Sequence, residues 1–171
     1  MPGSGSLTGL TMRKSNNTRR GFSLIELVIV VVIIAIIAAI AIPKMSRGAA
    51  GANDSALMQD LAQMRSAIEL FTAEHGGAAP SATATTFVTQ MTGYSDGTGA
   101  AVTAKDSTHI YGPYLKAIPP MPVGTNKGSN AVTNTGSVGT GTAGWFWDGT
   151  NIWCNNPAAD ADAKGTQYNQ Y

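Results

Sequence analysis

The sequence predicts an α+β fold in which a long N-terminal α-helix packs against a small antiparallel β-sheet. Three observations support this prediction. An unbroken apolar run covers residues 27–42, an amphipathic helical pattern follows at residues 54–75, and an aromatic hairpin pattern lies at residues 144–155. The first half of the helix is apolar enough for a membrane, whereas the second half has one apolar face.

Charge is unevenly distributed along the 171 residues. The net charge is +1, yet residues 1–21 carry four basic residues and no acidic one. Residues 22–171 carry seven basic and ten acidic residues, a net charge of −3. The composition gives no indication of a nucleic-acid partner, and the basic charge is concentrated just before the apolar run.

The apolar run is long enough to cross a membrane as a helix. Residues 27–42 are all apolar, and extension back to Phe22 adds only Ser23 and Glu26 as polar residues. At 1.5 Å per residue, residues 22–42 span about 30 Å, the thickness of a bilayer core. Strands rarely run this long, so we expect a membrane helix.

The residues around the run leave two alternatives to a membrane helix with a function of its own. Basic residues before it outnumber Lys44 and Arg47 after it, which favours a cytoplasmic N-terminus. A small-x-small site at residues 39–41 is typical of a secretory signal, with a mature chain starting at Ile42. An uncut membrane anchor is the other alternative. Glu26 argues against both, because a carboxylate in a membrane helix costs roughly 2.5–3.5 kcal/mol and usually marks a function.

Glu26 needs a cationic partner, and the apolar helix contains no basic residue. Cleavage after Gly21 would create an α-amino group on Phe22, four residues before Glu26. The geometry of a single helix does not bring these two groups together well, whereas a neighbouring helix offset along its axis would. The sequence therefore predicts side-by-side assembly of helices through this charge pair.

Residues 19–28, Arg-Arg-Gly-Phe-Ser-Leu-Ile-Glu-Leu-Val, resemble the processing site of type IV pilins and type II secretion pseudopilins. Proteins of that family have basic residues, then Gly and Phe, and a Glu at the fifth mature position. Pro43 also matches the family pattern. The resemblance implies that a prepilin peptidase cuts between Gly21 and Phe22 and methylates the amine of Phe22. It also implies that Glu26 guides incoming subunits onto a filament.

The resemblance extends to about residue 75 and implies three regions, with a pilin-like fold. These are a leader at residues 1–21, a transmembrane and assembly helix at residues 22–43, and a periplasmic or extracellular head at residues 44–171. The implied partners are identical or related pilin subunits, prepilin peptidase and a bacterial inner-membrane assembly platform. The leader is long, and a start at Met12 would leave a leader of more usual length.

Helix-weakening residues separate the two helical halves. Pro43 removes one backbone hydrogen bond, and Gly48 and Gly51 each cost about 1 kcal/mol relative to Ala. We expect a break or a hinge there, and the family resemblance favours a hinge that lets subunits pack. Asp54 or Ser55 then caps the second helical stretch.

One apolar stripe runs along residues 54–75, before Gly76 and Gly77 end the helix. Its residues are Leu57, Leu61, Met64, Ile68 and Phe71. We expect it to pack on a small sheet from the C-terminal part of the chain, with a coiled-coil partner as the lesser alternative.

The remaining head has one clear β pattern. Two aromatic runs flank Asp148-Gly149, which predicts a hairpin over residues 144–155 with Trp147 opposite Ile152. Elsewhere we expect a short helix within residues 78–93, with Phe87 and Met91 on one face, and an ordered extended connection at residues 109–122. Residues 124–143 read as an exposed loop, and the tail at residues 155–171 reads as polar and mobile.

The residues do not predict an enzyme. His75, His109 and the single cysteine, Cys154, give no zinc spacing and no nucleophile–base pair, and no intrachain disulfide can form. We expect no cofactor. Asp160 and Asp162 are candidate calcium ligands by resemblance to some major pseudopilins, although the EF-hand loop pattern is absent.

Two features bear on the branch of the family. Residues 112–115 and 144–148 resemble segments of the major type II secretion pseudopilin, but its typical Asp-Pro-Trp-Gly segment is absent. We expect a structural filament subunit, of a pseudopilus or a pilus. The alternative is an anchored or secreted binding module that uses its aromatic hairpin as a ligand face.

Overall fold

The computed structural model describes residues 21–171, apart from the side chains of residues 43, 46 and 47. The expected leader, Gly21 excepted, and the alternative start at Met12 lie outside the described residues. The described chain divides into two compact units, residues 21–41 and residues 42–171. We refer to residues 42–171 as the head.

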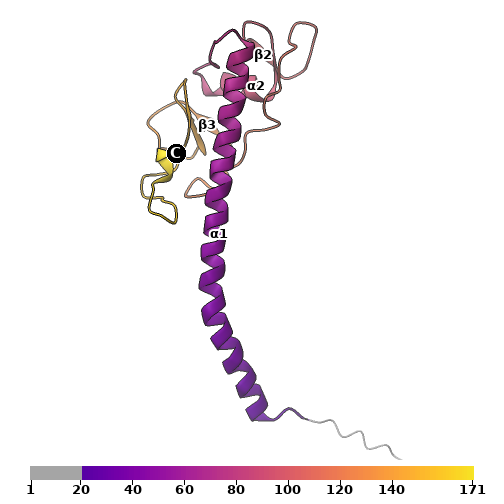
Figure 1. Ribbon diagram of the computed structural model, residues 1–171. Coiled ribbons are helices and arrows are strands. Elements are labelled where there is room, and N and C mark those ends of the chain that lie inside the picture. Colours follow the sequence, from indigo (N-terminus) through magenta and orange to yellow (C-terminus); the bar gives the residue numbers. More distant parts are fainter. Residues whose placement is uncertain (1–20) are drawn as a thin grey trace, which may run out of the picture. The chain divides into compact units, whose positions relative to one another are not determined.

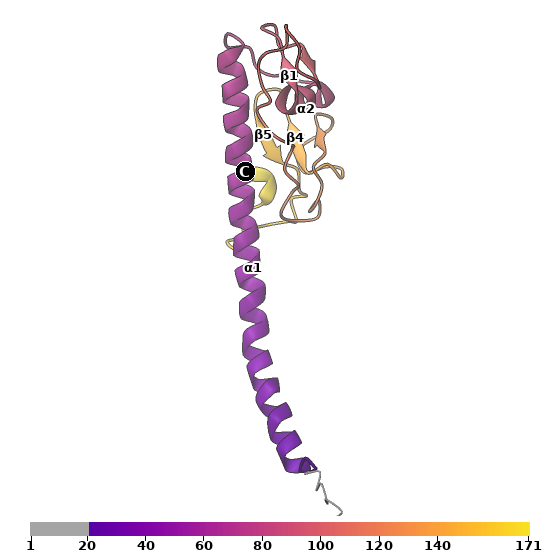
Figure 2. The same cartoon turned by 90° about the vertical axis from the view of Figure 1, so that its right-hand side faces the viewer.

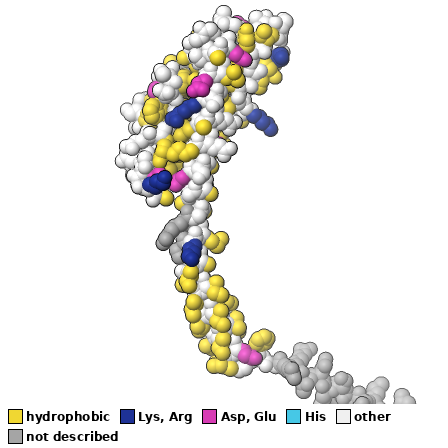
Figure 3. Space-filling view, in the orientation of Figure 1, with side chains coloured by type: hydrophobic (Ala, Val, Ile, Leu, Met, Phe, Trp, Pro, Cys, Tyr) yellow, Lys and Arg dark blue, Asp and Glu magenta, His cyan; other side chains and the backbone are white. Residues whose placement is uncertain are grey.

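In the first unit, the described chain becomes helical at Leu24. Helix α1 (Leu24–Glu74) begins there, and its part from Leu24 to Ile42 is long and apolar enough to cross a membrane. This part is unburied along its whole length, and apolar side chains cover the face seen in Figure 3. Length and composition therefore fit the membrane segment that the sequence predicts.

Helix α1 runs through the positions at which the sequence predicts a break. Pro43, Gly48 and Gly51 all have helical backbone. The expectation of two separate helical stretches, the second starting near residue 54, is therefore wrong for these residues. Proline and glycine impose local costs, but neither ends a helix when the flanking residues favour it. The boundary between the two compact units falls next to Pro43, and its role as a hinge stays a prediction.

The apolar stripe of α1 forms one wall of the core of the head, as predicted. Figures 1 and 2 show strands β4 (Trp145–Trp147) and β5 (Ile152–Cys154) beside the part of α1 that belongs to the head. The stripe residues are buried in one cluster with Trp145, Trp147, Ile152 and Cys154. The stripe positions are Leu57, Leu61, Met64, Ile68 and Phe71.

The end of α1 is also as predicted. The helix ends at Glu74, and Gly76 and Gly77 follow with φ values of 64° and 92°. The Gly77 N–H donates to the carbonyl oxygen of Thr72 at 2.8 Å. Glycine is suited to this left-handed turn because it has no Cβ, so the chain can reverse and return along the head.

The hairpin has the predicted register, but its sheet is mixed rather than purely antiparallel. Strands β4 and β5 pair antiparallel, with Trp147 opposite Ile152 and Trp145 opposite Cys154. Strand β3 (Val132–Thr133) adds to β4 in parallel and lies at the edge of the order β3-β4-β5. A second antiparallel pair joins β1 (Tyr94–Ser95) and β2 (Ala101–Val102).

The other segments cover the core. Helix α2 (Ala84–Thr92) confirms the predicted short helix, and its Phe87 and Met91 are fully buried. The connection at residues 109–122 contributes Leu115, Ile118 and Met121 to the core. The predictions for residues 124–143 and for the tail are corrected: the first segment contains β3, and the tail contains helix η1 (Tyr168–Gln170), with Tyr168 in the core cluster.

Candidate functional site

The N-terminal segment places a peptide bond and a carboxylate on the accessible start of α1. Gly21 and Phe22 precede the helix and are exposed, Phe22 to 86%. Among residues 21–171, nothing lies within 4 Å of a Cβ placed on Gly21. Within the described part of the chain, the Gly21–Phe22 bond is therefore exposed and precedes the helix.

Glu26 lies in the first turn of α1 and is exposed. Its carboxylate oxygen Oε2 accepts a hydrogen bond from the backbone N–H of Ser23 at 2.9 Å. A side chain at the third helical position that reaches back to the N-cap residue is one half of a capping box. The carboxylate thus satisfies an otherwise unpaired backbone N–H and lies at the positive end of the helix dipole.

Ser23 is the residue of this site that sequence reasoning missed. The signal was present, because Ser23-Leu24-Ile25-Glu26 has the S-x-x-E spacing of a capping box directly before an apolar run. The bond fixes where α1 begins and holds the Glu26 side chain towards the start of the helix. This is the end at which cleavage after Gly21 would create an amine.

The two candidate calcium ligands hold loops in the tail of the head. Asp160 accepts a hydrogen bond from the Thr125 N–H at 2.5 Å. Asp162 accepts bonds from the N–H groups of Lys164 and Thr166 and from the Tyr171 hydroxyl, and the Tyr171 bond is the main reason that the pKa of Asp162 lies below its usual range. Residues 21–171 contain no group of three His, Cys, Asp or Glu placed to hold a metal ion. Calcium binding stays a prediction.

The histidines and the cysteine are not brought together. His75 is buried against backbone carbonyl oxygens of Phe71 and Asp96, and His109 pairs with the carboxylate of Asp106. Cys154 is fully buried, and burial raises the pKa of its thiol to about 11. A buried, protonated thiol is a poor nucleophile.

Most aromatic side chains of the hairpin are buried in the core, and Trp153 is the partly exposed one. Trp145 and Trp147 are fully buried, and Phe146 is 8% exposed. Trp147 stacks on Phe87 with ring centroids 4.5 Å apart and donates its indole N–H to the Ser81 carbonyl oxygen. These aromatic side chains therefore belong to the core of the head, where their large apolar surface is buried. Burial of the other three rings leaves the binding-module alternative with Trp153 as its aromatic contact.

Residues 16–42 match the family model described as the prokaryotic N-terminal methylation motif. No curated protein and no solved structure matches the chain. The chain carries the signature of type IV pilins and pseudopilins, a class of structural rather than enzymatic proteins. The motif and the apolar start of α1 fit a membrane-anchored protein of the pilin type, and the head is consistent with an α+β pilin-like fold.

Proposed function

We propose that this chain is a structural subunit of a type IV pilus-like or type II secretion pseudopilus filament. The observation that carries the proposal is Glu26, a carboxylate at the start of an exposed apolar helix within the methylation motif. A membrane carboxylate is costly unless it has a partner, so its presence there indicates assembly with other subunits.

Processing is the first step of the proposed function. A prepilin peptidase of the inner membrane cuts between Gly21 and Phe22 and methylates the new amine of Phe22. The exposed, non-helical chain at this bond supports the assignment. Methylation keeps the nitrogen basic, so the mature chain begins with a positive charge four residues before Glu26.

Assembly through the helix is the second step. Within residues 21–171, Glu26 accepts a hydrogen bond from Ser23, and a carboxylate has further lone pairs for a second donor. The methylated amine of a neighbouring subunit supplies that donor and sets the axial offset between helices. The apolar side chains of residues 24–42 leave lipid and pack on one another, with Pro43 at the end of the packed segment.

The mass of the mature N-terminal peptide tests the processing step. The peptide is compared between cells that have prepilin peptidase and cells that lack it. We expect a peptide that begins at methylated Phe22, seen only when the peptidase is present. A chain that starts at Ile42 would indicate a secreted domain, and an uncut chain would indicate a plain anchor. Either result contradicts the proposal.

Replacement of Glu26 tests the assembly step. Glu26→Leu should abolish sheared filaments while leaving the amount of subunit in the membrane unchanged. Glu69→Leu is the matched control, because Glu69 is an exposed carboxylate on the same helix within the head. Normal filaments from Glu26→Leu would show that the carboxylate has no part in assembly.

A further inference from the structure

Ile110 is a large hydrophobic side chain that the head leaves 55% exposed. Among the described residues, the other exposed side chains of this kind lie on α1, except Phe22, which precedes it. A single exposed isoleucine needs no explanation by itself. Its surroundings therefore decide whether it has a role.

The backbone on both sides of Ile110 is fixed. The Asp106 carboxylate accepts bonds at 2.8 Å from the N–H groups of Thr108 and His109, and the His109 ring lies against the same carboxylate. On the other side, Tyr111 exchanges two backbone hydrogen bonds with Ser95, at 3.0 and 3.1 Å. Ile110 is thus held outward at little further cost in conformational entropy when it meets a partner.

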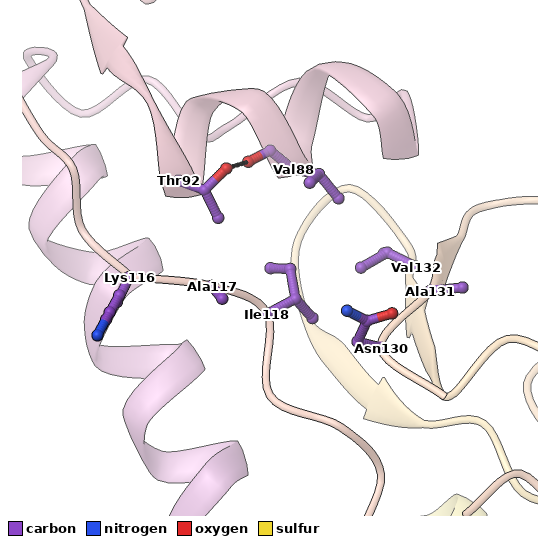
Figure 4. A pocket seen from close by; sticks show the side chains of 8 residues that line it. All are labelled: Val88, Thr92, Lys116, Ala117, Ile118, Asn130, Ala131 and Val132. Carbon is purple, nitrogen blue, oxygen red and sulfur yellow. Dashed lines mark hydrogen bonds between the residues drawn. The ribbon is translucent and has the colours of Figure 1, made fainter. Parts of the chain in front are cut away.

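An open groove lined by apolar side chains, to which an isoleucine side chain is suited, lies elsewhere on the head. Its volume is about 380 Å³, and it lies between α2, the segment at residues 116–118 and the edge strand β3. Figure 4 shows Val88, Ile118 and Val132 converging on it from these three elements. The groove therefore presents apolar side chains next to a strand edge that pairs only with β4.

The charges beside Ile110 and the groove are complementary. Lys116 lies at one end of the groove, and no carboxylate of the described residues is within 4.0 Å of its ammonium group. Next to Ile110, hydrogen bonds from the backbone of His109 and Thr108 lower the pKa of Asp106 to about 2, so this carboxylate is ionised at neutral pH. Such a pair of opposite charges favours one orientation of approach.

We propose that Ile110 of one subunit docks into the groove formed by Val88, Ile118 and Val132 of a second copy, with Asp106 directed towards Lys116. The proposal rests on the filament function proposed above and names a contact between heads. We choose a second copy of this chain as the partner because one chain carries both halves of the contact. Ile110 is exposed in its own chain, and the groove with Lys116 is open to solvent. A knob and a groove from different segments make a heterologous contact, which can propagate along a filament.

Disulfide trapping tests the contact. Ile110→Cys and Ala117→Cys are combined in the full-length protein, and sheared filaments are oxidised and run on a non-reducing gel. Ala117 lines the groove and is exposed, and the native Cys154 is buried. We expect a ladder of linked subunits. Ile110→Cys with Ala79→Cys is the matched control, because Ala79 is exposed but lies outside this groove.

Substitutions give a second readout. Ile110→Ser and Lys116→Glu should each lower the yield of sheared filaments about tenfold. This corresponds to a loss of about tenfold in the affinity between neighbouring heads, the effect expected when one contact is removed. Ile110→Val and Lys127→Glu should retain the yield. Filaments that form normally with Ile110→Ser, or that give no ladder or only dimers, overturn this contact and leave the filament function standing. If the unaltered protein forms no filaments, both proposals fail.

Discussion

The Asn156 side chain is fully buried and joins two segments of the head. Its Oδ1 accepts a hydrogen bond from the Asn126 N–H at 2.9 Å, and its Nδ2 donates to the Val123 carbonyl oxygen at 3.0 Å. Buried backbone groups of loops need such partners because no helix or strand supplies them. In this part of the head, amide side chains therefore supply the hydrogen bonds that neighbouring strands would supply in a larger sheet.

Asn156→Ala should lower the free energy of unfolding by about 2–3 kcal/mol, because it leaves buried polar groups of Val123 and Asn126 without partners. Urea denaturation of the full-length protein in detergent measures this change. Asn134→Ala is the control, since Asn134 is exposed in the same region, and it should change stability little. Equal effects from the two substitutions would show that the buried bonds contribute nothing.

The buried thiol of Cys154 gives a pH dependence with a definite sign. Its pKa is raised by burial to about 11 in the folded head, above the value in the unfolded chain. The folded state therefore binds the proton more tightly, so its contribution is complete below the unfolded pKa and is lost as pH rises towards the folded value. Unfolding midpoints should fall between about pH 9 and about pH 11, and they should fall less in Cys154→Ala. The same slope in both proteins would contradict this.

At the scale of secondary-structure elements, the sequence predicted the parts with strong local signals. The hairpin register followed from Asp148-Gly149 between aromatic runs, and the buried face of α1 followed from its period. Strand β3 could not be predicted, because two residues inside a Gly- and Thr-rich segment have no period and gain strand geometry only by pairing with β4. The tail was missed for a similar reason, since its contacts are with residues far away in sequence.

At the N-terminal site, too, some features could be predicted from the sequence and others could not. The methylation motif was recognised because it is local and specific, and the roles of Gly21, Phe22 and Glu26 stay predictions. The continuous helix through Pro43 was not predicted. The energetic cost of a proline in a helix suggested that the helix would break there. The Ser23–Glu26 bond was missed although its spacing was readable.

Gly149 tests the hairpin turn. It has φ of 92°, in the left-handed region that side chains avoid, and a Cβ there would lie 3.3 Å from the Cβ of Ala82. Gly149→Ala should lower the free energy of unfolding by about 1–2 kcal/mol. Gly97→Ala is the control, because Gly97 has no positive φ and no described atom lies within 4 Å of a Cβ placed on it. Thermal unfolding of both variants makes the comparison, and a control as unstable as Gly149→Ala would contradict the strain argument.

At the scale of the whole molecule, the head depends on its last residues. The Tyr168 hydroxyl donates to the Asp54 carboxylate on α1 at 2.6 Å, which ties the C-terminal segment to the helix that opens the head. Burial, reinforced by the hydrogen bond to Asp54, raises the pKa of Tyr168. The beginning and the end of the head are thus joined directly.

Tyr168→Phe should weaken this link by about 1.5–3 kcal/mol, the range for a hydrogen bond to a charged group. Limited proteolysis should then cut the chain after residue 155 faster than in the unaltered protein. Tyr94→Phe is the control, because Tyr94 is only partly buried and lies far from the tail in sequence. An unchanged rate of cutting in Tyr168→Phe would mean that other contacts hold the tail.

Cys154 is the single cysteine of the chain and is enclosed by the core. The contacts that hold the described head together are hydrogen bonds and apolar packing, which form equally well in oxidising and reducing surroundings. The head therefore folds without a thiol oxidase or a disulfide isomerase. For this protein, the redox potential of the compartment is not a condition for making a correctly folded head.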